Sequence, residues 1–215
     1  MPVQVKSPII NFYGLETPFR CGVFGSSRTG KTTIIYDLLR KDLFDRKFET
    51  IYYCFPNIYE NDLDWHKHLD ANIEYLDHLP NSELISNLEP HSLLILDDCW
   101  YACTQEPIIR DLFKVVSGKK NLSIFVTSQN PYEGGTHART IRNNMNYFLL
   151  FRHLGDQQIN RRLTQQLGLL PQYDAAAKIG KKFSHSCIFV NVDVALEHEE
   201  LRVSTNILGQ PIIIV

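Results

Sequence analysis

Short apolar runs alternate along this chain with longer stretches in which apolar residues recur at helical spacing. The runs are rich in Val, Ile, Leu and aromatic residues, which is typical of buried strands. Near-continuous apolar strands separated by helices predict a mostly parallel sheet that is covered on both faces. We predict strands at 19–24, 50–55, 73–76, 92–97, 122–127, 147–151 and 186–192, and helices at 31–42, 82–88, 106–117, 137–144, 156–167 and 172–180.

The chain has 215 residues, of which 44% are hydrophobic, so it is long enough for one substantial α/β core and short for two. We therefore expect a single domain over 1–215. Glycines stand where three helix C-caps are expected, at Gly118, Gly168 and Gly180. The expected parts are an N-terminal extension (1–17), a core (18–152) and C-terminal helices and strands (153–215), with an insertion at 56–70 and a glycine-bearing loop at 128–136. The tail 201–215 would add edge strands or pack on a neighbouring subunit.

The formal net charge of −2 does not favour bulk affinity for nucleic acid, so any such partner must meet a local basic patch. The first residues do not have the pattern of a signal peptide, and no apolar run reaches about 18 residues, so we expect an intracellular protein without membrane partners. The odd number of five cysteines, without paired spacing, predicts unpaired thiols in a reducing compartment. Cys99 and Cys103 lack a matching histidine pair, which argues against a zinc site.

The most specific motif of the chain is a glycine loop between a predicted strand and a predicted helix. Backbone N–H groups of such a loop and of the helix start attract phosphate, so the sequence predicts binding of a nucleoside triphosphate. Lys31 would reach the β- and γ-phosphate oxygens, and the Thr32 hydroxyl would bind Mg²⁺. The loop reads Gly25-Ser26-Ser27-Arg28-Thr29-Gly30-Lys31-Thr32, and Thr33 follows it in the helix.

Two acids end the predicted strand 92–97, at the sheet edge where ligands bind in parallel sheets. Asp97 is placed to hold Mg²⁺, and Asp98 to orient or deprotonate the attacking water. The alternative for Asp98 is that it only caps the next helix.

The next strand ends in Gln129, which could bind the γ-phosphate or the attacking water and sense hydrolysis. Its alternative role is to close the loop through backbone bonds. The run that begins at Gln129 is Gln-Asn-Pro-Tyr and not the N-K-x-D of guanine-specific proteins, so we expect ATP.

Together these motifs resemble those of the FtsK–HerA superfamily of ring ATPases, and specifically its viral genome-packaging branch of the poxvirus and Maverick/Polinton type. The resemblance covers about 18–152 and includes the Ile-Arg-Asn-Asn run at 141–144 before another strand. It implies a P-loop NTPase fold: three α/β/α layers around a central, mostly parallel sheet of the additional-strand, RecA-like type. Asp98 departs from the family pattern, because many members have Glu at this position.

The resemblance also implies a Mg²⁺-dependent ATPase that assembles into a pentameric or hexameric ring and moves double-stranded DNA. A capsid portal or vertex protein is an implied partner, and the implied location is the site of virion assembly in the host cell, or the virion itself. An arginine would enter the neighbouring subunit's site; Arg142 is the leading candidate, followed by Arg139 and Arg110. Lys114, Lys119, Lys120, Arg161 and Arg162 are candidate DNA contacts, with a plain solvated surface as the alternative.

Two rival functions stay open at this point. A P-loop kinase of a small acceptor would need an acceptor pocket and an arginine-rich lid, and no lid is evident in the sequence. A nucleotide-gated assembly protein would bind ATP and oligomerise without useful turnover. The three hypotheses differ in whether Asp98 and duplex DNA matter for hydrolysis.

Overall fold

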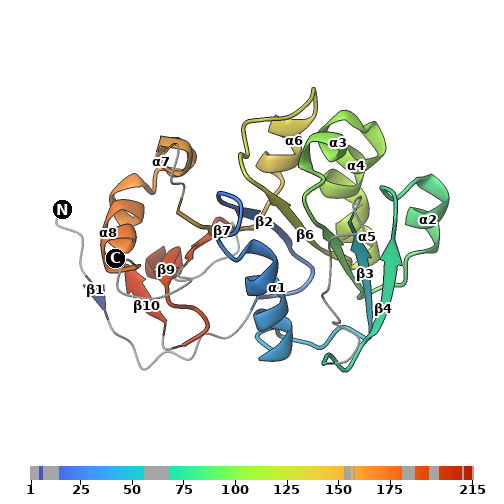
Figure 1. Cartoon of the computed structure of the whole chain (residues 1–215), viewed down its shortest axis with the longest axis horizontal. Helices are drawn as coiled ribbons and strands as arrows, with labels where there is room; N and C mark the ends of the chain where they lie inside the picture. The colour runs from blue at the N-terminus through green and yellow to red at the C-terminus, as the bar shows by residue number, and fades with distance from the viewer. Residues whose placement is uncertain are drawn as a thin grey trace.

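Ten strands form one continuous sheet in the computed structural model of the protein (Figure 1). Their order across the sheet is β1-β10-β9-β8-β7-β2-β6-β5-β3-β4. The structure describes residues 5–6, 15–55, 68–152, 156, 158–180, 187–193, 199–209 and 211–214.

Six neighbouring strands are parallel and carry the predicted chemistry. In spatial order they are β7 (Tyr147–Leu150), β2 (Arg20–Phe24), β6 (Ser123–Ser128), β5 (Leu93–Leu96), β3 (Thr50–Cys54) and β4 (Asn72–Leu76).

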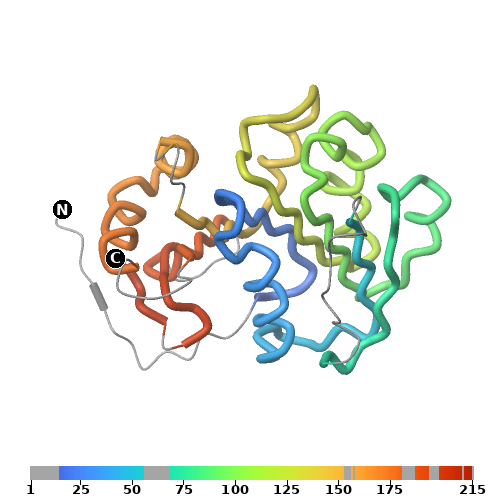
Figure 2. Tube along the Cα trace, viewed as in Figure 1, coloured from blue at the N-terminus to red at the C-terminus, as the bar shows by residue number. Residues whose placement is uncertain are grey.

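Beyond β7 the sheet continues with antiparallel strands. These strands are β8 (Ile188–Asn191), β9 (Val203–Thr205), β10 (Ile212–Ile214) and β1 (Val5–Lys6). Figure 2 shows the result: the blue segment with β2 lies at the centre, between the green segment and the orange-to-red segment.

Helices connect the strands and cover the sheet (Figure 1). They are α1 (Lys31–Arg40), α2 (Ser82–Asn87), α3 (Trp100–Gln105), α4 (Pro107–Asp111), the π-helix η3 (Leu112–Val116), α5 (Ser117–Lys120), α6 (Ala138–Asn143), α7 (Gln158–Gln166), α8 (Leu170–Gly180) and the 3₁₀-helix η4 (Glu199–Leu201).

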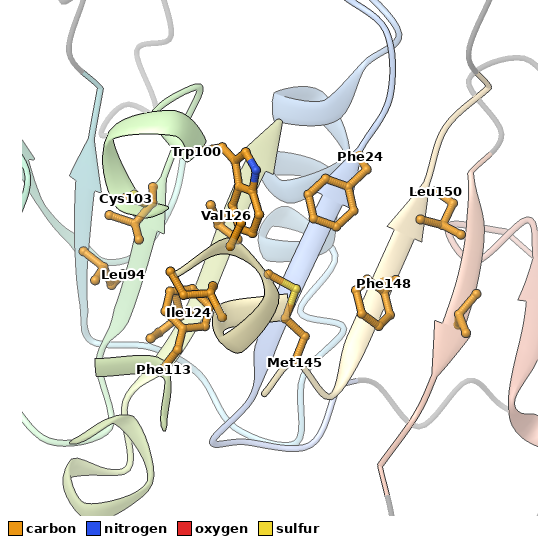
Figure 3. Close-up of a cluster of buried hydrophobic side chains, with 14 of the residues drawn as sticks. Phe24, Leu94, Trp100, Cys103, Phe113, Ile124, Val126, Met145, Phe148 and Leu150 are labelled. Carbon is orange, nitrogen blue, oxygen red and sulfur yellow. The ribbon is translucent and has the colours of Figure 1, made fainter. Parts of the chain in front are cut away.

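Alternate residues of each buried strand point to opposite faces, and this divides the interior into two cores. Cys21 and Val23 of β2 pack on the face that α1 covers. Phe24 packs on the other face, which α2, α3, α6, α7 and α8 cover; Figure 3 shows its ring beside Trp100 and Phe148. The predicted three-layer arrangement is therefore confirmed, and every strand of the parallel block except the edge strand β4 is buried.

The seven predicted strands are all present, with ends within two residues of the prediction. Because β6 lies between β2 and β5, the strand that leads to the glycine loop and the strand that ends in the acids are not neighbours, as the additional-strand type requires. The tail forms strands β9 and β10, but they are not edge strands as expected, because β1 pairs with β10 and is itself the edge of the sheet. Most of the predicted insertion at 56–70, namely 56–67, lies outside the described residues.

Two predictions about helices are wrong. Helix α3 was not predicted, because it begins directly after the acids and carries no clear apolar period. Gly118 is not a C-cap: it lies inside α5, and Asn121 (φ 52°) takes the left-handed position that ends this helix. Asparagine tolerates this conformation better than most residues, and the sequence analysis overlooked it.

The close packing of β2 makes the Gly22→Ala substitution a sharp test of the fold. A Cβ at Gly22 would lie 2.5 Å from the Phe24 ring and 2.8 Å from Met145 Sδ, two groups that adjoin each other in Figure 3. We expect this overpacking to lower the free energy of unfolding by about 1–3 kcal/mol in urea titrations.

Gly118→Ala is the matched control, because a Cβ there meets no atom within 4 Å. Inside a helix this substitution should stabilise the protein by roughly 0.5–1 kcal/mol. Equal effects of the two substitutions would contradict the described packing around β2.

Candidate functional site

The glycine loop between β2 and α1 lies against the ends of two neighbouring strands. The Gly25 N–H donates to the Ser128 carbonyl at 3.1 Å, at the end of β6. A Cβ at Gly25 would lie 2.4 Å from Phe151 Cβ, just beyond β7, so only glycine fits there. Gly30 has φ 96°, in the left-handed region that glycine favours. Close packing at Gly25 and the left-handed backbone at Gly30 thus explain why both positions are glycine.

The remaining loop residues leave the start of α1 open. Thr29 Oγ1 donates to the Ser26 carbonyl at 2.8 Å, whereas Ser27 and Arg28 are exposed. No side chain caps α1, and its first turn, which contains Thr33, carries no acid. The amides of a first helical turn lack partners within the helix, so this turn is suited to bind an anion such as phosphate.

Lys31 lies across the glycine loop. Its Nζ donates to the carbonyls of Gly25 and Ser26, at 2.9 and 3.0 Å. Burial lowers the pKa of Lys31, while the nearby charges of Asp98 and Asp97 raise it. The structure therefore brings the lysine of the loop into electrostatic range of both predicted acids.

Asp97 is the centre of the site. It is 3% exposed, and its carboxylate accepts hydrogen bonds from three hydroxyls on three different elements. Thr32 Oγ1 and Tyr53 Oη donate to Oδ2 at 2.9 and 2.6 Å, and Thr127 Oγ1 donates to Oδ1 at 2.5 Å. Buried carboxylates need such donors, because a buried and unpaired charge is costly.

Asp98 differs from Asp97 in its exposure and in its backbone conformation. Its side chain is exposed, and its backbone has φ 52°, a left-handed conformation that few residues other than glycine adopt. Its N–H donates to Thr127 Oγ1 at 2.9 Å, which fixes this turn. The alternative that Asp98 caps the next helix is wrong, because the N-cap of α3 is Cys99, without a side-chain hydrogen bond.

Partial burial raises the pKa of Asp98, the charge of Lys31 lowers it, and the charge of Asp97 raises it. The side chain remains accessible even though the surrounding protein partly desolvates the carboxyl group. A carboxylate with a raised pKa next to a phosphate-binding loop has the properties of a proton acceptor.

Two residues of this network, Thr127 and Tyr53, were missed by the sequence analysis. Each is a hydroxyl residue near the carboxyl end of a parallel strand, β6 and β3, beside the strand that ends in Asp97. The sequence did contain a signal for these two residues, because polar residues at the carboxyl ends of apolar parallel strands converge on one edge of the sheet. The order of the strands, which sets which ones adjoin Asp97, was not evident from the sequence.

Thr32 and Asp97 fit the predicted Mg²⁺. Their oxygens lie 2.9 Å apart, and Mg²⁺ prefers hard oxygen ligands, commonly one or two protein groups together with substrate phosphates and water. Among the described residues no group of three or more His, Cys, Asp or Glu side chains could hold a metal by itself. The pair therefore suits a metal that arrives with a nucleotide.

Gln129 follows β6 directly and is exposed at the same edge of the sheet as the glycine loop. The residues beside it close the loop. Asn130 N donates to Ser128 Oγ at 3.2 Å, and Tyr132 N donates to Asn130 Oδ1 at 2.9 Å. The Gln129 side chain has no part in these bonds.

The candidate arginines occupy different environments. Arg142, half-buried on α6, donates from Nη1 to the Pro131 carbonyl at 2.8 Å and lies over the Tyr132 ring. Arg139 is exposed on the same helix. Arg110 binds the adjacent Asp111 through two hydrogen bonds, at 2.7 and 2.9 Å. Arg110 is thus the candidate with a carboxylate partner in its own chain.

The candidate DNA contacts differ in their exposure and in their partners. Lys114 and Lys119 are exposed, whereas Lys120 Nζ donates to the carbonyls of Ser86 and Leu88. The adjacent Arg161 and Arg162 differ as well: Arg161 pairs with Asp174 at 3.0 Å, and Arg162 lies over the Tyr132 ring.

The five cysteines are free, as predicted from their number and spacing, and all of them are buried. In the part of the chain that the structure describes, no helix has the length and apolar character needed to cross a membrane.

Comparisons with known proteins agree with this architecture. No family model matches the sequence, and no curated protein matches it significantly. The solved genome packaging NTPase B204 from Sulfolobus turreted icosahedral virus 2, in complex with AMPPCP, is similar at a TM-score of 0.57 and 12% identity, over 87% of this chain and 96% of that chain.

Its complex with ATP-gammaS is similar at a TM-score of 0.55 and 15% identity, over 83% of this chain and 94% of that chain. B204 from Sulfolobus Turreted Icosahedral Virus, described as the DNA-packaging ATPase, is similar at a TM-score of 0.55 and 12% identity, over 88% and 97% of the two chains. At these identities the likeness concerns the fold, which is that of a P-loop NTPase.

The Thr127 hydroxyl gives the first test of the site. Thr127→Val removes the donor to a buried carboxylate oxygen and the acceptor of the Asp98 N–H, so we expect a loss of about 2–3 kcal/mol in the free energy of unfolding. We also expect the stabilisation by Mg²⁺ and ATP in thermal melts to shrink, because Asp97 loses its orientation.

Thr205→Val is the matched control. Its hydroxyl is also buried and donates only to the Cys187 carbonyl, at 3.1 Å, on the antiparallel side of the sheet. This variant should lose roughly 1 kcal/mol and keep its response to the nucleotide. If both variants respond to Mg²⁺ and ATP as the unmodified protein does, Thr127 does not organise the site.

Proposed function

We propose that this chain is an ATP-hydrolysing translocase of double-stranded DNA, the motor subunit of a viral genome-packaging machine. The observation that carries the proposal is the pairing of a buried acid, Asp97, bonded to Thr32 of the glycine loop, with an accessible acid, Asp98, in range of Lys31. A packaging role is supported by the similar fold of the solved viral packaging NTPases. One continuous sheet supports the expectation of a single ATPase domain.

In this proposal each residue of the site has one task. Thr32 and Asp97 would hold Mg²⁺, which neutralises phosphate charge when it is bound. Lys31 would exchange its bonds to the loop carbonyls for the β- and γ-phosphate oxygens. Asp98 would accept a proton from the attacking water, and Gln129 would sense the terminal phosphate.

The proposed motor is an oligomer, because one chain of 215 residues cannot encircle a duplex. We propose a ring of five or six copies in which Arg142 enters the neighbouring site, with Arg139 as the second candidate. A guanidinium beside the γ-phosphate can raise the rate by about 10³–10⁵. A capsid portal or vertex protein would anchor the ring where virions assemble.

Asp98→Asn separates hydrolysis from binding. Asparagine tolerates the left-handed backbone at this position, and the raised pKa of Asp98 means that the folded protein disfavours the charged form. The variant should therefore keep its thermal stability at neutral pH and bind ATP, while kcat falls roughly 10²–10⁴-fold. A nucleotide-gated assembly protein would instead keep its function in this variant.

The pH dependence of hydrolysis provides a second readout of Asp98. A base works in its ionised form, so hydrolysis by the unmodified protein should decline as the pH falls through the raised pKa of this carboxyl group. The decline should lie above the range of an ordinary aspartate, whose pKa is about 3.9. A rate that is flat down to that range would argue against Asp98 as the base.

Duplex DNA should stimulate hydrolysis. We expect a higher ATPase rate with duplex DNA at low salt and a smaller increase at high salt, because phosphate contacts release counterions. The measurement is a steady-state ATPase assay at two salt concentrations, with a mixture of small acceptors as the control. Stimulation by a small acceptor and not by duplex DNA would favour a kinase and contradict the proposal.

A further inference from the structure

Two arginines that the sequence analysis assigned to different ligands share one aromatic ring. The Arg142 guanidinium of α6 lies 4.6 Å from the centroid of the Tyr132 ring, and the Arg162 guanidinium of α7 lies 4.4 Å from it. Arg142 was expected at a neighbour's nucleotide and Arg162 at DNA. Since both cations lie against the same side chain, the structure makes them parts of one group, which we call the Tyr132 cluster.

Two hydrogen bonds hold Arg142 and Tyr132 of the Tyr132 cluster in place. Arg142 Nη1 donates to the Pro131 carbonyl at 2.8 Å, and the Tyr132 hydroxyl donates to Gln166 Oε1 at 2.9 Å. Side chains fixed in this way lose little freedom when they bind a ligand, so the cluster is prepared for binding.

The positive charges of the arginines around Tyr132 repel one another. Burial lowers the pKa of Arg142, the Tyr132 hydroxyl raises it, and the charges of Arg162 and Arg139 lower it further. Arg139 stands three residues before Arg142 on α6, so both lie on one face of this helix. Among the described residues no carboxylate pairs with any of these three arginines, whereas the adjacent Arg161 binds Asp174 at 3.0 Å. Cations gathered without a counter-ion favour the binding of an anion, and guanidinium groups match phosphate in geometry.

The Tyr132 cluster and the glycine loop of the same chain are built from different contacts. Lys31 donates to the Gly25 and Ser26 carbonyls, whereas Arg142 donates to the Pro131 carbonyl and lies over the Tyr132 ring. Because these contacts share no residue, the cluster is a second cationic group beside that of the glycine loop.

We propose that Arg142 and Arg162 form one phosphate-binding site around Tyr132, with Arg139 at its edge, and that this site takes a phosphate from outside the chain. The inference rests on the proposed function, in which two phosphates come to the surface of a subunit: the terminal phosphate of a neighbour's nucleotide and the backbone phosphate of DNA. The chemistry of both is the same, and the experiment separates the two sources.

The test compares Arg142→Gln, Arg162→Gln and the double variant, with Arg161→Gln as the matched control on the same helix. One readout is the affinity for duplex DNA over a salt series without ATP, and the other is the ATPase rate without DNA at protein concentrations that allow assembly. Both single variants should impair the same readout, and the double variant should lose less than the sum of the two effects. Arg161→Gln should change either readout less than Arg162→Gln does, because Asp174 already pairs with the Arg161 guanidinium.

The impaired readout identifies the source of the phosphate. Contact with DNA predicts that the slope of log affinity against log salt falls by about 0.9 for each lost contact. Contact with a neighbour's nucleotide predicts an ATPase rate that falls by roughly 10³-fold or more with unchanged DNA affinity. The one-site proposal is overturned if the two variants impair different readouts, if their effects add, or if Arg162→Gln equals the control.

Chemical labelling of arginines tests the site independently of the proposed function. Phenylglyoxal labels accessible arginines, and mass spectrometry locates the label in the unmodified protein. Inorganic pyrophosphate should protect Arg142 and Arg162 together and leave Arg161 reactive. If the protein neither binds duplex DNA nor hydrolyses ATP, the proposed function falls, and joint protection still supports the site. Without joint protection the site itself is refuted.

Discussion

The buried carboxylate of Asp97 organises the functional edge of this protein, because it accepts hydroxyl hydrogen bonds from α1, β3 and β6 at the same time. A buried carboxylate is costly unless donors surround it, so these three hydrogen bonds hold the three elements in one arrangement. Thr127 extends the network by accepting the Asp98 N–H, which sets the left-handed turn that turns the second acid outward. One acid is thus a fixed anchor, and the other remains accessible for chemistry.

Helix α3, which begins directly after the acids, connects them to the loop that follows Gln129. Trp100 Nε1 donates to the Glu133 carbonyl, and Thr104 Oγ1 accepts from the Gly135 N–H at 2.7 Å, so α3 holds the loop that follows Gln129. The same loop carries Tyr132 and its two arginines. Covalent and hydrogen bonds therefore connect the acids and the loop after Gln129 to the Tyr132 cluster.

Much of the fold could be predicted from the sequence, because buried parallel strands are apolar on both faces and the helices between them keep their own period. The glycine loop and the acid pair were also evident, since each is a local pattern with its own chemistry. Tyr53 and Thr127 were missed because their importance depends on which strands adjoin β5, and strand order is not a local property. Arg142 and Arg162 were assigned to different ligands for the same reason: they lie 20 positions apart in the chain, and only the folded structure places both on Tyr132.

The central claim is that Asp97 fixes the site while Asp98 acts in it, and a crystal structure with Mg²⁺ and a non-hydrolysable ATP analogue tests it most directly. We predict that the Thr32 hydroxyl binds the metal, that Asp97 keeps its bonds to Tyr53 and Thr127, and that the Asp98 carboxylate faces a water beside the terminal phosphate. A metal bound away from Thr32 and Asp97, or an Asp98 side chain turned away from the nucleotide, would contradict this division of roles.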